Sequence, residues 1–328
     1  MTNSRRKLIV AFGASIFSYP LRSVAQQLAP AARIGVLLVL LSPEGEEARA
    51  FRQGLRDAGY VEGRNLVIEW RSAIGDYSRL PELAADLVQR KVNVIVADTT
   101  LAVQTAQKAT STIPVVMTLV ADPVGSGMVA NLARPGANTT GLSIMLAELS
   151  VKRLQLLKEV IPQLSRVAVL WNPPSPYQPK AMEDLKAAAP SLAIELSFMD
   201  VRTPEQLDSA FAAVNRARAQ ALYVLDSPLF FTHRTTITRF ASGVRLPVIS
   251  GEKPFADAGG LMTYGANYAD QMRRAAGYVD KILKGTKPGD LPIEQPTKFD
   301  LVINMKTAKA LDITVPSPIL LRADQLIK

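Results

Sequence analysis

The sequence predicts an α/β protein made of two doubly wound, Rossmann-like lobes, each built on a parallel sheet. Three observations predict it. Short apolar runs alternate with amphipathic stretches, the same pattern occurs twice, and 328 residues suit two domains. Apolar residues make up 48% of the chain and charged residues 20%, as in ordinary globular proteins. This composition excludes a disordered or fibrous chain.

Eight short apolar runs predict the strands. The runs are continuous rather than alternating, which is typical of parallel strands covered on both faces. They span 34–41, 66–70, 92–97, 115–120, 167–171, 194–199, 222–225 and 247–249. The stretches between them space their apolar residues as helices do, and predict helices at 44–58, 78–89, 101–109, 149–161, 177–189, 204–217 and 235–242.

The strand–helix pattern contains an internal repeat, which indicates that one domain plan occurs twice. The first and last of three matching pairs are each separated by 133 residues, and the middle pair by 128. The pairs are RIGVL at 33–37 with RVAVL at 166–170, IPVV at 113–116 with LPVI at 246–249, and between them VADT at 96–99 with VLDS at 224–227.

Three segments interrupt the alternation and are rich in Gly, Pro, Asn or Asp. They lie at 138–143, 251–260 and 289–298, and we expect them to be hinge crossovers between the lobes. The predicted boundaries place 33–143 with 255–285 in lobe I, and 144–253 with 290–328 in lobe II.

Residues 1–25 have the layout of a secretory signal peptide. Basic residues at 5–7 precede a mostly apolar run at 8–17, and a small-x-small site follows at 23–25. The apolar run is shorter than the about 20 residues that a spanning helix needs. The two arginines also resemble a twin-arginine export signal. We therefore expect a periplasmic protein with a cleavable signal, and no lipid anchor because the chain has no cysteine.

Charge and cysteine content exclude several classes of function. The net charge is +9, of which four charges lie in the predicted signal, and the remaining basic residues are scattered. We therefore expect no nucleic-acid partner. The absence of cysteine excludes disulfides, a cysteine nucleophile, iron–sulfur clusters and thiolate zinc sites. With a single histidine as well, we expect no metal and no cofactor.

The candidate site follows from the predicted topology, because open α/β sheets bind ligands at the carboxyl ends of their strands. Hydroxyls and backbone N–H groups at Thr99 and Thr100 suit an anion, and the carboxylates of Asp98 and Asp226 suit an ammonium group. Helix capping is the alternative for each of these residues. The predicted ligand-binding set is Ser42, Asp98, Thr99, Thr100, Ala121, Asp122, Asn172, Tyr177, Asp226, Ser227, Ser250 and Tyr264.

Signals for an enzyme are weak. A relaxed dinucleotide fingerprint at 125–130 has no preceding tight strand–glycine turn, and no phosphate-binding loop or serine nucleophile elbow occurs. His233 has no nucleophile beside it in the sequence, and we expect a solvated residue at a helix start. Asp98 and Asp226 facing each other would leave a carboxylate-dependent hydrolase open as an alternative.

The chain resembles the extracytoplasmic substrate-binding proteins of a family of ABC transporters that includes tryptophan- and tyrosine-binding relatives. The resemblance runs from about residue 33 to the C-terminus. It rests on DPVGSG at 122–127, NLARPGANTTG at 131–141, KRLQLLK at 152–158, YVDKILKG at 278–285, LPIEQPTKFDLVIN at 291–304 and KTAKAL at 306–311.

The resemblance implies a type I periplasmic binding protein fold with a small solute held between the lobes, and a membrane permease and an ATPase as partners. It implies no chemistry. Carried onto this chain, it places a carboxylate at Thr99 and Thr100, with Asp226 or Asn172 opposite. The proline-rich loop at 172–179 departs from the pattern. The solute that we expect is an amino acid, either aromatic or not, or an aromatic acid.

Two other functions stay open at this point. A sensor subunit would use the same lobes to present a solute to a receptor, and the exported hydrolase described above is less favoured. In each case we expect a monomer.

Overall fold

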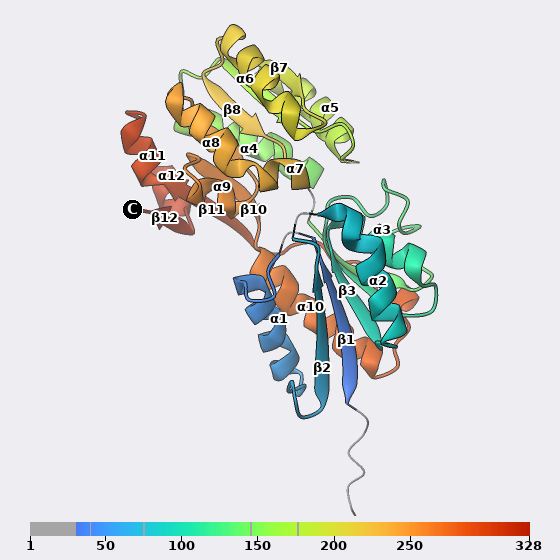
Figure 1. The fold of residues 1–328 in the computed structure, drawn as a ribbon. Helices are drawn as coiled ribbons and strands as arrows, with labels where there is room; N and C mark the ends of the chain where they lie inside the picture. Colours follow the sequence, from blue (N-terminus) through green and yellow to red (C-terminus); the bar gives the residue numbers. More distant parts are fainter. Residues whose placement is uncertain (1–30, 40, 75, 145, 176) are drawn as a thin grey trace, which may run out of the picture.

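Lobe I is built on a five-stranded sheet in which every neighbouring pair is parallel. The computed structural model describes residues 31–328 apart from 40, 75, 145 and 176, so the predicted signal at 1–25 lies outside the described residues. The strand order is β2-β1-β3-β4-β5 (Figure 1). The strands are β1 (Ala32–Leu38), β2 (Leu66–Ser72), β3 (Val94–Asp98), β4 (Val115–Val120) and β5 (Thr139–Ser143).

Helices cover both faces of this sheet, which explains why β3 and β4 are buried along their whole length. On one face, α1 (Glu46–Asp57) packs against α10 (Tyr268–Leu283), and Gly54 allows the close approach because a Cβ there would overlap the backbone of α10. On the other face lie α2 (Leu80–Gln89), which follows a short helix η1 (Tyr77–Arg79), and α3 (Thr99–Ala109).

Lobe II repeats the plan of lobe I and extends it. Its sheet has the order β12-β11-β10-β9-β8-β6-β7, so β7-β6-β8-β9-β10 reproduces the strand order of lobe I. This confirms the predicted duplication. The strands are β6 (Arg166–Trp171), β7 (Glu195–Asp200), β8 (Ala221–Val224), β9 (Val248–Ser250), β10 (Met262–Ala266), β11 (Phe299–Asn304) and β12 (Gln325–Ile327). Only the β10–β11 pair is antiparallel among the described strands.

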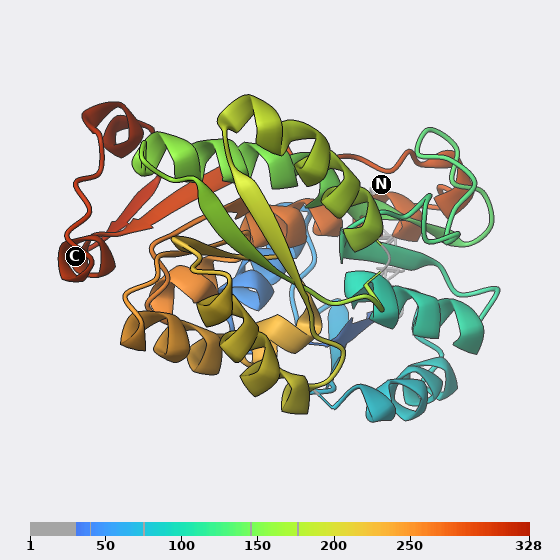
Figure 2. The ribbon, with the colours of Figure 1, turned by 90° about the horizontal axis from the view of Figure 1, so that it is seen from above.

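Figure 2 shows α4 and α5 on one side of the lobe II strands, with α6 and α8 on the other. The helices are α4 (Leu146–Val160), α5 (Gln178–Ala188), α6 (Leu207–Arg216), α7 (Pro228–Thr232), α8 (Arg234–Gly243), α9 (Lys253–Asp257), α11 (Met305–Ala310) and α12 (Ser317–Arg322). Short helical turns η2 (Ala189–Leu192), η3 (Pro204–Gln206) and η4 (Pro288–Asp290) connect these elements.

The chain passes between the lobes three times, as expected, but at different places from two of the predicted crossovers. The segment at 138–143 is mostly β5, and the first passage follows it. The second lies near Asn267, after β10, because β10 pairs with β9 in lobe II. Assigning 255–266 to lobe I was therefore wrong. Residues 291–294 lie beside β5 in lobe I, so the third passage follows at 294–299.

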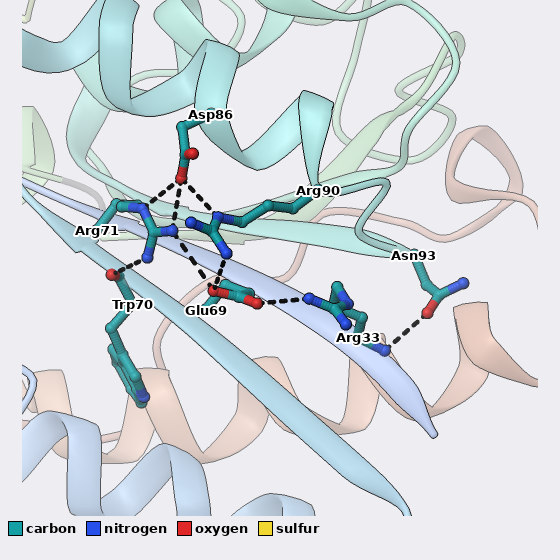
Figure 3. Close-up of polar contacts among 7 residues, drawn as sticks. All are labelled: Arg33, Glu69, Trp70, Arg71, Asp86, Arg90 and Asn93. Atoms are coloured by element: carbon teal, nitrogen blue, oxygen red, sulfur yellow. Dashed lines mark hydrogen bonds and ion pairs between the residues drawn. The ribbon is translucent and has the colours of Figure 1, made fainter. Parts of the chain in front are cut away.

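The edge strand β2 carries a charged network on one face (Figure 3). The Glu69 carboxylate lies 2.6 Å from Arg33, 3.4 Å from Arg71 and 3.5 Å from Arg90, while Asp86 of α2 joins the last two. Trp70, on the opposite face, packs edge-on against a phenylalanine of α1. The network ties β2 to α2 and gives the sheet a charged edge that disfavours pairing with another chain.

Candidate functional site

A cavity of about 580 Å³ lies between the two lobes, at the carboxyl ends of their strands. In Figure 1 the lobe I strands β1, β2 and β3 run toward lobe II. Eight of the twelve predicted site residues line this cavity: Asp98, Thr99, Thr100, Ala121, Asn172, Tyr177, Asp226 and Ser227. Most of the residues that were predicted from the rule about strand ends therefore lie around one cavity.

The polar wall of lobe I is the start of α3. Asp98 is the N-cap residue and is 1% exposed, and its Oδ1 accepts a 2.7 Å hydrogen bond from the backbone N–H of Val39. Thr99 has φ +62°, a conformation rare for a β-branched residue. Its hydroxyl is buried and has no hydrogen-bond partner among the described residues. Free N–H groups at a helix start and an unused hydroxyl suit an anion such as a carboxylate.

Much of the remaining wall is apolar. Leu119 and Ile144 contribute from lobe I, and Pro228, Leu229 and Phe231 from lobe II. Such walls suit an apolar or aromatic part of a ligand, because its burial removes apolar surface from water.

Asp226, predicted to face an ammonium group, already has a cationic partner in the structure. The guanidinium of Arg153, on α4, lies 2.8 Å from its Oδ2. Its Oδ1 accepts hydrogen bonds from the Ser250 hydroxyl at 3.1 Å and from the Gly251 N–H at 2.9 Å. Burial alone would lower the pKa of Arg153, but the charge of Asp226 raises it above its ordinary value. The two charges are therefore paired with each other within lobe II, while Nη2 of Arg153 has no hydrogen-bond partner among the described residues.

Three other predicted residues of lobe II line the cavity while using polar atoms to hold its loops. The Tyr177 hydroxyl donates a 2.7 Å hydrogen bond to the Asp226 carbonyl, and the Asn172 side chain donates to the Val201 carbonyl at 2.7 Å. The Ser227 hydroxyl caps α7 by accepting a hydrogen bond from a backbone N–H. These interactions give the wall a defined shape, and that of Ser227 is helix capping.

Four predicted residues lie outside the lining of this cavity. The Ser42 hydroxyl accepts from the Glu44 N–H at 3.2 Å, and Asp122 accepts from the Gly125 N–H at 2.7 Å, so each shapes its own turn. The Ser250 hydroxyl donates to the Asp226 carboxylate, as described above. Tyr264 stacks on Phe299 at 6.0 Å between ring centroids. These four side chains shape or support the loops that they occupy.

The predicted ligand-binding set leaves out Glu252 and Tyr268, which line the cavity close to the hinge. Glu252 is 7% exposed and its Oε1 lies 3.4 Å from the Tyr268 hydroxyl, which donates to it. Burial, and then the nearby Asp226, raise the pKa of the Glu252 carboxyl well above its usual range. Glu252 lies in the loop that follows the predicted strand at 247–249, and this position was the available signal. His233, expected in solvent, is half-buried and also lines the cavity.

Neither a metal cluster nor a membrane span is found in the described part of the chain. Among residues 31–328, less the four gaps, no three His, Cys, Asp or Glu side chains are grouped to hold a metal ion. Within the same residues, no helix is long and apolar enough to cross a membrane.

Comparison with known proteins agrees with the geometry. A tyrosine-binding protein of Clostridioides difficile strain R20291 is 28% identical over 281 residues, 85% of this chain and 81% of that protein. A conserved domain protein of Vibrio cholerae is 30% identical with a TM-score of 0.80, covering 90% of this chain and 99% of that one. An ABC domain from Streptococcus pneumoniae, in complex with L-Trp, is 24% identical with a TM-score of 0.80, covering 90% and 100%.

The fold and the family are both shown by these findings. The two-lobed architecture is that of type I periplasmic binding proteins, as the resemblance implied. Residues 33–327 match the model of a family described as ABC transporter substrate binding protein. The chain belongs to this family of ABC transporter substrate-binding proteins.

Proposed function

We propose that the protein captures an amino acid with an aromatic or apolar side chain between its lobes and delivers it to an importing permease driven by an ATPase. The observation that carries the proposal is the cavity of about 580 Å³, which has a polar wall in lobe I and apolar walls on both sides. Tyrosine and tryptophan in the names of two similar proteins support this choice of solute class.

The start of α3 is the proposed carboxylate site. Thr99 and Thr100 line the cavity there, and the Thr99 hydroxyl is free among the described residues to donate a hydrogen bond. A carboxylate at this position would also interact favourably with the positive end of the helix dipole. The side chain of the solute would lie against Leu119, Ile144 and Phe231.

The protein as proposed binds its solute without changing it chemically. Closure of the lobes around the solute would present one surface to the permease, because ligand contacts with both lobes favour the closed state. Export as a periplasmic monomer through the signal at 1–25 belongs to the same proposal. The mass of the mature N-terminus and light scattering of the purified protein would check these two points.

A thermal-shift screen of the twenty L-amino acids and of aromatic acids tests the solute class. A true solute at a hundredfold excess over its Kd should add about 2.7 kcal/mol to the free energy of unfolding. Stabilisation by an aromatic or apolar amino acid is the expected result. If no solute raises the melting temperature at millimolar concentration while a partner protein does, the proposal is wrong.

The transport step needs a separate test. Cross-linking of the solute-loaded protein in membranes of its own host should capture a permease with its ATPase. Capture of a receptor instead would favour the sensor alternative.

A further inference from the structure

Glu252 has no role in the proposed carboxylate site. It lies just after β9, at the N-cap of α9, and forms part of the wall of the 580 Å³ cavity. It also lines a second cavity of about 210 Å³ beside the hinge, with Leu41, Phe231 and Tyr268 shared between the two. A carboxyl group that is 7% exposed therefore faces the space between the lobes.

The two oxygens of this carboxyl differ in their hydrogen bonds. Tyr268 donates to Oε1 at 3.4 Å, whereas Oε2 has no hydrogen-bond partner among the described residues. Buried polar atoms in proteins are nearly always hydrogen-bonded, so an unpaired carboxyl oxygen in a cavity wall indicates a place for a donor from a ligand.

The cations near Glu252 are already engaged elsewhere. Arg153 pairs with Asp226 at 2.8 Å. Arg234 of α8 donates to the Phe231 carbonyl at 2.7 Å and covers the Phe231 ring. Lys253, the next residue, pairs with Asp257 on the exposed face of α9. Glu252 therefore has no cation of its own in the described structure.

The other titratable groups around Glu252 are acids and phenols. Asp226 adds a negative charge, and the hydroxyls of Tyr77, Tyr177 and Tyr268 come from three further elements. Burial and Asp226 raise the pKa of Glu252 by more than the charges of Arg153 and Arg234 lower it, because a buried carboxylate that has no ion pair of its own is costly to ionise.

We propose that Glu252 receives the ammonium group of the solute and releases a proton to solvent when the solute binds. This inference rests on the proposed function. In the empty site the raised pKa favours the neutral carboxyl. On binding, its O–H bond breaks, the proton leaves to bulk water, and the positive charge of the R–NH3⁺ group takes its place beside the carboxylate. The ammonium group keeps all its protons, so charge and atoms balance.

This coupling defines a class of solutes and a direction of pH dependence. Below the pKa of Glu252 in the empty protein, affinity for an amine-bearing solute should rise up to tenfold for each unit of pH. A carboxylic acid that lacks the amine should show no such gain, because it offers no charge to compensate the ionised Glu252. The proposal therefore assigns selection of the amine to lobe II, and leaves the carboxylate to the start of α3.

Isothermal titration calorimetry in phosphate and in Tris buffers measures the protons exchanged, because these buffers differ in ionisation enthalpy. The probes are L-tyrosine and L-tryptophan, with phenylpropionate and indole-3-propionate as the matched acids without an amine. For the wild-type protein we expect release of up to one proton per amino acid. For Glu252→Gln we expect no release and an affinity at least tenfold lower. The control Glu47→Gln alters a carboxyl that lines only the second cavity, and should behave as wild type.

A second variant keeps the test valid if Glu252→Gln does not fold. Tyr268→Phe removes the donor to Glu252, so its pH profile should move to higher pH while the melting temperature reports folding. Amino acids that bind without proton release, or with unchanged affinity in Glu252→Gln, would overturn this inference and leave the proposed function standing. If neither the amino acids nor the acids bind the wild-type protein, both are wrong.

Discussion

The Nη1 atom of Arg153 lies 2.8 Å from Oδ2 of Asp226, with the two side chains 0% and 3% exposed. The same guanidinium donates through Nε to the Tyr264 carbonyl at 2.6 Å. The pair thus joins α4, the end of β8 and the strand β10 behind the cavity. The cavity wall of lobe II is supported by an internal charge pair rather than by apolar packing alone.

Replacing Asp226 should destabilise the protein. We expect Asp226→Asn to lower the free energy of unfolding by about 3–5 kcal/mol, because it leaves the charge of Arg153 buried and unpaired. Urea denaturation without solute measures this. The control Asp200→Asn breaks an exposed pair with Arg202 and should cost less than about 1 kcal/mol. A stable Asp226→Asn protein that has lost only solute binding would instead make Asp226 a ligand contact.

Gly251 is expected to tolerate no side chain. A Cβ at this position would overlap the guanidinium of Arg153 and the carboxylate of Asp226, so Gly251→Ala should separate the pair and lower the melting temperature. Gly277→Ala is the control, because that helical glycine has open space around it and alanine favours helix. Calorimetry should show a loss for the first variant and no loss for the second; equal melting temperatures would contradict the tight packing.

The raised pKa of Glu252 makes stability depend on pH. The native protein holds a proton there that the unfolded chain releases above the ordinary pKa of 4.5. Stability should therefore fall as pH rises from about 4.5 toward the native pKa, by at most about 1.4 kcal/mol per unit. Glu252→Gln should remove this slope and be the more stable protein at pH 8. Urea midpoints from pH 5 to 8 measure it. Glu205→Gln alters an exposed acid and should leave the slope unchanged; parallel curves for wild type and Glu252→Gln would show that Glu252 is ionised.

Replacing Thr99 should change both the stability of the protein and its affinity for the solute. Its φ of +62° is strained for threonine and easy for glycine, so Thr99→Gly should raise the free energy of unfolding by about 1 kcal/mol. The same variant loses the hydroxyl proposed to hold the carboxylate and should bind an aromatic amino acid less tightly. Thr99→Ser keeps the hydroxyl and is the control for binding. Denaturation and calorimetry on the three proteins would measure both effects, and unchanged affinity in Thr99→Gly would remove this hydroxyl from the site.

The sequence predicted the strands whose residues form a continuous apolar run and missed those whose residues are mixed. All eight predicted strands are present in the structure, because apolar runs such as β3 and β4 are covered on both faces. The missed strands include β5 and β10, in which polar residues and glycine replace the apolar run. These two strands form because neighbouring strands pair with them, so their own sequence gives little indication of a strand.

The sequence by itself determined the family, the duplication and the side of each sheet on which a solute should lie. These follow from local patterns repeated along the chain and from one rule about parallel strands. Only the tertiary structure decided which carboxylate near the cavity has a cation. Arg153 and Asp226 are 73 residues apart, and no pattern in the sequence joins them. Their pairing gives Asp226 a cation inside lobe II. Among the described residues, no ion pair is found for the buried carboxyl of Glu252, two residues beyond β9. The energy of a buried charge depends on neighbours that only folding brings together.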